Sequence, residues 1–162
     1  MADTPTDAPH RSRLMHVEPQ WIDYNGHLNM AYYNVLFDRG ADDLFEEFGF
    51  GPDYAKTTGF STFSAEFHVC YLREVHEGDP VYVTSQLIDF DEKRFHFYQE
   101  LWHEDGWLSA TGEGLGLHID LSGPKVAPMP PERFAAMREV MEAHARLPRP
   151  ERVGRRIGIE RR

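Results

Sequence analysis

The residues best suited to chemistry form one polar run, Trp21-Ile22-Asp23-Tyr24-Asn25-Gly26-His27-Leu28-Asn29, directly before a predicted helix. A free aspartate carboxyl has a pKa of about 3.9, so Asp23 is expected to be ionised at neutral pH. Such a carboxylate can attack a carbonyl carbon, or it can take a proton from an attacking water molecule. The local sequence leaves both roles of Asp23 open.

The start of the predicted helix adds a second chemical feature. The first backbone N–H groups of a helix have no partner within it, and the helix dipole places about half a positive charge there. A thioester carbonyl oxygen pointing at Gly26, His27 or Leu28 would therefore meet an oxyanion site. The plainer alternative is that Asp23 and Asn25 only satisfy backbone groups of a turn.

Other side chains are candidates for binding a substrate. Glu66 and His68 are two residues apart in a predicted strand, so both point away from the face that carries Phe63, Phe67 and Tyr71. They could face solvent or a subunit interface. Aromatic residues near Asp23 could line an acyl pocket, although most aromatic side chains belong to the core. The candidates for substrate binding are Trp21, Tyr24, Asn25, Leu28, Tyr33, Glu66 and His68, beside the catalytic candidates Asp23, Gly26, His27 and Asn29.

Other chemistries lack their motifs in this sequence. There is no H-E-x-x-H, no C-x-x-C pair, no G-x-x-x-x-G-K and no G-x-S-x-G. We therefore expect no metal site and no cofactor. The single cysteine, Cys70, rules out a disulfide within the chain and is interpreted as an inert buried thiol.

Composition and charge narrow the class of protein further. The chain has 162 residues, which suits one domain, and its formal charge of −10 argues against a general nucleic-acid binder. No apolar run is long enough to span a bilayer and no signal peptide is evident, so we expect a cytoplasmic protein without membrane contact. Residues 146–162 carry seven arginines against two glutamates, about +5, which leaves about −15 for the rest. This tail could bind an anion, or it could be an exposed or interface segment without that role.

The predicted helix spans Met30 to Phe48. Its apolar residues recur at three and four positions, as in an amphipathic helix: Tyr33, Phe37, Ala41, Leu44 and Phe48. Asn29 is a suitable N-cap and Gly49 a suitable C-terminal cap. Gly40, in the middle, predicts that another backbone packs closely against the helix.

The remaining periodicity predicts an α+β domain. Strands are expected at Leu14 to Glu18 and then around residues 63–71, 81–90, 94–103 and 107–121, and short turns between the last four predict an antiparallel meander. Gly112, Gly114 and Gly116 share one strand face, where the long helix is expected to approach. A C-terminal helix is predicted from Pro131 to Ala145. The resulting divisions are a flexible N-terminus (1–12), one domain (13–145) and an arginine-rich tail (146–162).

The run from Asp23 to Tyr33 resembles the D-x-x-G-H-x-N-x-x-Y signature of hotdog thioesterases related to 4-hydroxybenzoyl-CoA thioesterase. That resemblance implies a single hotdog domain, with an antiparallel sheet wrapped round one long helix. It also implies that Asp23 is the nucleophile or base, and that Gly26 and the helix start polarise the thioester carbonyl.

Longer stretches resemble betainyl-CoA thioesterases of carnitine breakdown, which also occur fused to L-carnitine dehydrogenases. The matching segments are 71–75, 117–121, 128–131 and 147–159. The resemblance implies hydrolysis of betainyl-CoA in a homodimer or dimer-based tetramer, with active sites between protomers and an association with a carnitine dehydrogenase. Aromatic faces and acids would suit the trimethylammonium group, and Arg73 or the tail could bind the CoA phosphates. The alternatives are a thioesterase for other short-chain or aromatic acyl-CoAs, and a non-catalytic acyl-CoA-binding module.

Overall fold

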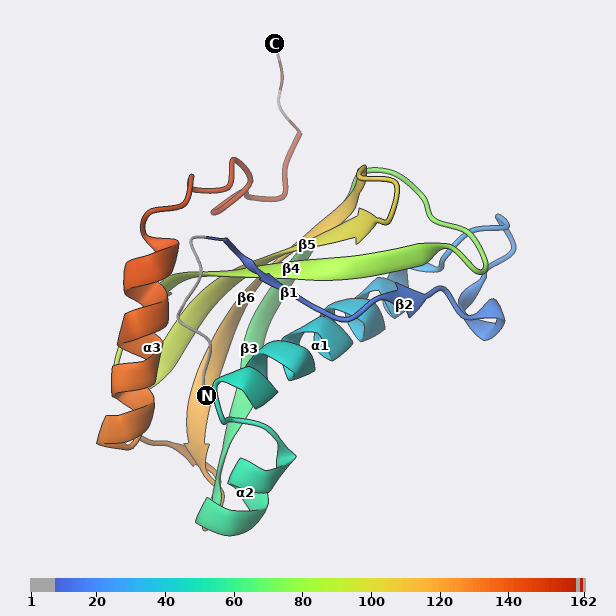
Figure 1. Ribbon diagram of the computed structural model, residues 1–162. Helices are drawn as coiled ribbons and strands as arrows, with labels where there is room; N and C mark the ends of the chain where they lie inside the picture. The colour runs from blue at the N-terminus through green and yellow to red at the C-terminus, as the bar shows by residue number, and fades with distance from the viewer. Residues whose placement is uncertain (1–7, 160, 162) are drawn as a thin grey trace.

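The computed structural model of the chain describes residues 8–159 and residue 161 (Figure 1). Positions 1–7 of the expected flexible N-terminus, and Glu160 and Arg162 of the expected tail, lie outside the described residues. The elements in chain order are β1 (His10–Arg11), β2 (Met15–His16), the 3-10 turn η1 (Pro19–Trp21), α1 (Met30–Glu47), α2 (Pro52–Thr58), β3 (Phe60–Tyr71), β4 (Pro80–Phe90), β5 (Arg94–His103), β6 (Leu108–Asp120), β7 (Lys125–Val126) and α3 (Pro131–His144). The predicted α+β class is confirmed, whereas α2 was not predicted.

Helix α1 begins at Met30 as its sequence predicts and ends at Glu47, one residue before the predicted end at Phe48. The Asn29 side-chain Oδ1 accepts a hydrogen bond from Ala31 N at 3.0 Å, so Asn29 is the N-cap. At the other end, Gly49 takes a φ of 72°, a conformation that glycine adopts without strain. Gly40 is closely packed as predicted, but its neighbour is a side chain rather than a backbone: a Cβ there would lie 2.6 Å from Val83 Cβ.

The described strands form one antiparallel sheet with the order β1-β4-β5-β6-β3, and β2 and β7 pair with β4 and β6. The predicted meander is confirmed for β4, β5 and β6, but its first hairpin is wrong, because β3 pairs with β6 and not with β4. Residues 72–79 join β3 to β4 without a hairpin, and Leu72 N and Arg73 N both donate to Ser109 O, at 2.9 and 3.0 Å. Strand β3 therefore forms one edge of the described sheet, and its outer side has no strand partner there.

A β-bulge interrupts β3 at Ala65. Ser64 lies opposite Gly116 and Glu66 lies opposite Leu115, so β3 contains one extra residue at this point. One extra residue reverses the face to which all preceding side chains point. Phe63 therefore lies on the opposite face from Phe67, although the alternation in the sequence predicted one shared face.

Aromatic rings cover the glycines of β6. A Cβ at any of the three positions would collide with a phenyl ring, from Phe67 at Gly112, Phe97 at Gly114 and Phe95 at Gly116. Two of these rings meet α1 edge-on, Phe67 with Phe37 at 5.5 Å and Phe95 with Phe45 at 5.7 Å between centroids. The expectation of direct helix contact at the glycines is thus wrong, because a layer of rings separates α1 from β6.

Helix α3 and the chain that follows it lie on opposite faces of the sheet (Figure 1). Helix α3 packs Met137 and Val140 against Leu87 and Phe97, on the face that also carries α1. The chain after α3 folds over the opposite face, where Gly154 N donates to the Glu113 carboxylate at 2.9 Å. Strand pairing begins at His10, ahead of the boundary expected at residue 13. No helix among the described residues is long and apolar enough to cross a bilayer.

Candidate active site

Asp23 sits in a tight turn that fixes half of its carboxylate. Its Oδ1 accepts a hydrogen bond from Asn25 N at 2.8 Å, and its backbone carbonyl accepts one from Gly26 N at 3.0 Å. Gly26 has a φ of 81°, which suits a residue without Cβ. Oδ2 of Asp23 accepts no hydrogen bond from any described residue. One carboxylate oxygen therefore holds the turn, while the other is free to react.

A cavity of about 440 Å³ opens beside this turn. Three segments form its wall: the turn itself, the first turn of α1 and the start of the connection between β3 and β4. The lining residues are Asp23, Tyr24, Asn25, His27, Leu28, Asn29, Met30, Tyr33, Tyr71, Leu72, Arg73 and Glu74.

The backbone N–H groups proposed for an oxyanion site are not equally available. Gly26 N donates within the turn, and Leu28 N donates to Val75 O at 2.9 Å. Among the described residues, His27 N has no acceptor. The prediction of three candidate donors is therefore corrected to one, His27 N–H, because the turn and the β3–β4 connection take up the other two.

Two tyrosines form the side of the cavity next to α1. The rings of Tyr33 and Tyr71 meet edge to face, with centroids 5.0 Å apart. Burial raises the pKa of the Tyr33 hydroxyl, hydrogen bonding to Ser109 and to the Val75 backbone opposes this rise, and the charge of Glu74 adds to it. Burial also raises the pKa of the Tyr71 hydroxyl. Both hydroxyls are therefore neutral at pH 7 and can donate hydrogen bonds.

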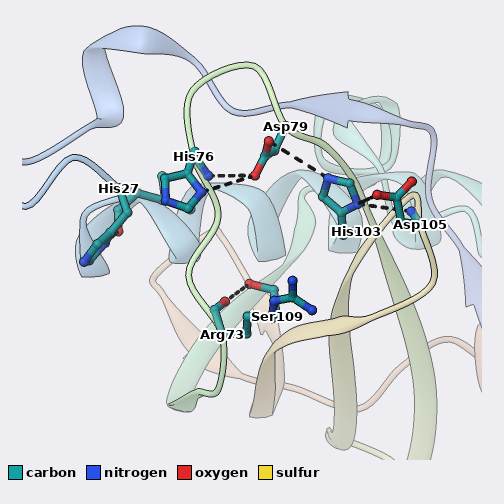
Figure 2. A network of polar contacts seen from close by, with 8 residues as sticks. His27, Arg73, His76, Asp79, His103, Asp105 and Ser109 are labelled. Atoms are coloured by element: carbon teal, nitrogen blue, oxygen red, sulfur yellow. Dashed lines mark hydrogen bonds and ion pairs between the residues drawn. The ribbon is translucent and has the colours of Figure 1, made fainter.

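Arg73 is the arginine in the wall of this cavity, and two contacts hold it in place. Its carbonyl accepts a hydrogen bond from Ser109 Oγ at 2.7 Å (Figure 2). Its guanidinium lies over the Trp107 ring, 3.9 Å from the ring centre. A guanidinium stacked in this way is directed toward the aromatic ring. The positive charge of Arg73 is thus held on Trp107.

A series of polar contacts also holds the connection between β3 and β4 in place (Figure 2). His76 N donates to Asp79 Oδ2 at 2.8 Å, and Asp79 Oδ1 lies 4.0 Å from His103 Nε2. His103 Nδ1 accepts from Asp105 N at 3.1 Å, and the His103 ring stacks on Trp107 with centroids 4.6 Å apart. These contacts fix residues 72–79 against the end of the sheet. Within the described chain, no group of three or more His, Cys, Asp or Glu is arranged to hold a metal ion.

The structure brings most of the predicted site residues together, but not all of them. Trp21 is 4% exposed and stacks on Tyr32 in the core, so it does not line the cavity as predicted. Its ring is large and apolar, and burial is its more favourable place. Asn29 lines the cavity while its side chain caps α1, which was the alternative interpretation of this residue.

Glu66 and His68 lie away from the cavity. They are opposite Leu115 and Glu113 on the sheet face that points away from α1. The prediction that they point away from Phe67 and Tyr71 is therefore confirmed, because strand alternation directs them to the other face. Within one chain they do not line the cavity beside Asp23, and their role in substrate binding stays a prediction.

Sequence reasoning missed four residues of the cavity wall. They are Met30, Tyr71, Leu72 and Glu74, three of which surround Arg73 at the end of β3. The signal was the length of the connection between the strands at 63–71 and 81–90, which exceeds that of a tight hairpin and so allows the chain to reach another part of the fold.

The sequence and the fold together identify the class of protein. The chain belongs to the thioesterase-like superfamily, whose sequence model matches residues 17–143. A Staphylococcus aureus protein solved in complex with CoA, SAV2348, shares 25% identity and a TM-score of 0.86 with it, over 94% of this chain and 98% of that one. The hotdog domain expected from the sequence is thereby confirmed.

Two relatives of higher sequence identity have names that state a substrate. A betainyl-CoA thioesterase of Pseudomonas aeruginosa is 40% identical over 144 residues, which cover 88% of this chain and 91% of that protein. An L-carnitine dehydrogenase/betainyl-CoA thioesterase of Rhizobium meliloti is 36% identical over 147 residues, 90% of this chain but only 29% of that longer protein. The resemblance stated from the sequence motifs is confirmed by these matches.

Proposed function

We propose that this protein is an acyl-CoA thioesterase that hydrolyses betainyl-CoA to betaine and free CoA. The observation that carries the proposal is a pair of groups in the wall of a cavity of about 440 Å³. These are Oδ2 of Asp23 and the N–H of His27, neither of which has a hydrogen-bond partner among the described residues. The Pseudomonas aeruginosa relative, whose length this chain nearly covers, supports the choice of acyl group.

The arrangement can polarise a thioester and attack it. The carbonyl oxygen would accept a hydrogen bond from His27 N–H, close to the positive end of the α1 dipole. Asp23 Oδ2 would then attack the carbonyl carbon, expelling CoA thiolate and leaving an acyl anhydride that water hydrolyses. In the alternative path, Asp23 takes a proton from a water molecule that attacks directly. Both paths consume one water molecule and release betaine and CoA, and neither requires a cofactor.

Substitution of Asp23 by Asn provides the test. Asn keeps an oxygen that can accept from Asn25 N, so the turn should persist, while the nucleophile or base is lost. We expect the rate of thiol release from betainyl-CoA to fall by at least about 100-fold. Asp53→Asn is the matched control, because the Asp53 side chain is 97% exposed on α2 and outside the cavity.

A panel of acyl-CoAs decides among the remaining alternatives. Faster release from other short-chain or aromatic acyl-CoAs would assign a different substrate to the same chemistry. Binding of CoA without thiol release from any member of the panel would favour a non-catalytic module. Turnover unchanged in Asp23→Asn would overturn the catalytic assignment.

We further propose that the protein acts in the cytoplasm as a homodimer or dimer-based tetramer. Strand β3 supports this, because it is an edge strand of the described sheet and leaves the Phe67 ring 36% exposed. Pairing of β3 with its copy would cover the Phe67 ring and place the cavity near the partner. A monomer in sedimentation experiments would refute the proposed dimer or tetramer.

The fused Rhizobium meliloti relative supports a further proposal, an association of this protein with a carnitine dehydrogenase.

A further inference from the structure

The length of the proposed acyl group restricts where its charge can lie. In a betainyl thioester a single methylene separates the carbonyl carbon from the nitrogen, so these two atoms are about 2.5 Å apart. When the carbonyl carbon is in reach of Asp23, the trimethylammonium group must occupy the same cavity. Any groups that recognise the cation are therefore among the residues that line this cavity with Asp23.

Tyr71 offers the cation an aromatic surface. It is the last residue of β3, and its side chain remains 46% exposed although it lines the cavity. Its hydroxyl donates to Met30 O at 3.2 Å, and its ring meets the buried Tyr33 edge to face. The ring is thus held at both ends against the start of α1. Quaternary ammonium groups bind to the faces of such rings.

Glu74 supplies negative charge next to Tyr71. It lines the same cavity, and its carboxylate is close enough to the Tyr33 hydroxyl to raise the pKa of that group. Glu74 forms no ion pair with any other residue that the structure describes. The carboxylate is therefore available to a cationic ligand.

The neighbouring Arg73 would normally neutralise such a carboxylate, but its charge is held elsewhere. The guanidinium lies 3.9 Å from the centre of the Trp107 ring, and Trp107 does not line the cavity. Trp107 is itself stacked on His103, and the Arg73 backbone is bonded to Ser109. Among the described residues of the wall, the acids Asp23 and Glu74 thus line the cavity while the guanidinium of the one arginine is held on Trp107.

We propose that Tyr71 and Glu74 form the subsite that recognises the quaternary ammonium group of the acyl chain, and that Trp107 keeps Arg73 from competing with the cation. This inference rests on the proposed thioesterase function and adds the determinants of its acyl specificity. Tyr71 contributes the ring face and Glu74 the countercharge, and neither takes part in bond breaking.

The test compares betainyl-CoA with 3,3-dimethylbutanoyl-CoA, which has a carbon in place of the charged nitrogen and nearly the same shape. The measured quantity is the ratio of kcat/KM for the two substrates, from free-thiol release. We expect Glu74→Gln to lower this ratio about tenfold and Tyr71→Leu about fivefold, in each case with the larger change for betainyl-CoA. Tyr71→Phe, which keeps the ring, should retain more of the preference than Tyr71→Leu.

Glu77→Gln is the matched control, since Glu77 is exposed in the same connection but lies outside the cavity. Its ratio should stay within twofold of that of the unaltered protein. The proposal is overturned if Glu74→Gln and Tyr71→Leu keep the ratio, or if Glu77→Gln lowers it equally, which would indicate a long-range charge effect. Equal rates for both substrates in the unaltered protein would remove the cation subsite but keep a thioesterase. Release from neither substrate would refute the proposed function itself.

Discussion

Gly40 in α1 is expected to accept no side chain, because Val83 of β4 lies directly against it. A Cβ on residue 40 would lie 2.6 Å from Val83 Cβ, 2.8 Å from Cγ1 and 3.0 Å from Cγ2. Val83 is fully buried, so it cannot move into solvent. Overpacking of this kind costs about 1–3 kcal/mol, while alanine is better than glycine in a helix by about 1 kcal/mol. A 2.6 Å approach to a fully buried side chain corresponds to the upper part of this overpacking range, about 2–3 kcal/mol, so Gly40→Ala should destabilise the fold by about 1–2 kcal/mol.

Urea unfolding of a double-mutant cycle measures this contact. Val83→Ala removes both γ-methyl groups but keeps Cβ, so it relieves two of the three close approaches to residue 40. We expect Gly40→Ala to cost about 1 kcal/mol less in the Val83→Ala background than alone. Gly123→Ala is the matched control, because nothing lies within 4 Å of a Cβ at that position. A Gly40→Ala variant as stable as the unaltered protein, or a coupling energy of zero, would refute the reasoning.

Two further predictions concern the cap of α1 and a half-buried acid. Asn29→Ala should lower the free energy of unfolding by about 1 kcal/mol, because Ala31 N loses its acceptor. Asn29→Ser should retain most of the stability of the unaltered protein, because a serine hydroxyl can also accept from that N–H. Equal urea midpoints for the two variants would contradict this prediction. Burial raises the pKa of Glu100 above its ordinary value of 4.5, so its contribution to stability is full below the unfolded pKa and is lost as pH rises through the folded pKa. Glu100→Gln should thus be more stable than the unaltered protein at pH 7 and lose this advantage near pH 4, and an advantage independent of pH would exclude ionisation as its cause.

Features with a local cause could be predicted from the sequence. The apolar spacing of α1, the cap at Asn29 and the left-handed Gly49 each depend on residues within a few positions of one another. The turn around Asp23 is of the same kind, because Asn25 N and Gly26 N bond to Asp23 itself. For this reason the central polar motif of the site was visible in the sequence.

Features that depend on distant segments could not be predicted in the same way. Strand alternation does not specify the partner of β3, so the meander was expected and pairing with β6 was found. The bulge at Ala65 leaves no mark in the sequence pattern, yet it reverses the face of Phe63. The glycines of β6 correctly signalled a close approach, but only the structure identifies phenyl rings as the neighbours.

The sequence by itself determined which carboxylate lies in the turn before the long helix, and with it the class of chemistry that Asp23 could perform. Only the tertiary structure decided which groups surround that carboxylate. The crossing of residues 72–79 from β3 to β4 occupies Leu28 N through Val75 O and brings Tyr71 and Glu74 to the cavity wall. The physical reason is that hydrogen bonds and packing between segments far apart in the chain depend on the path of the backbone, which residue spacing does not specify.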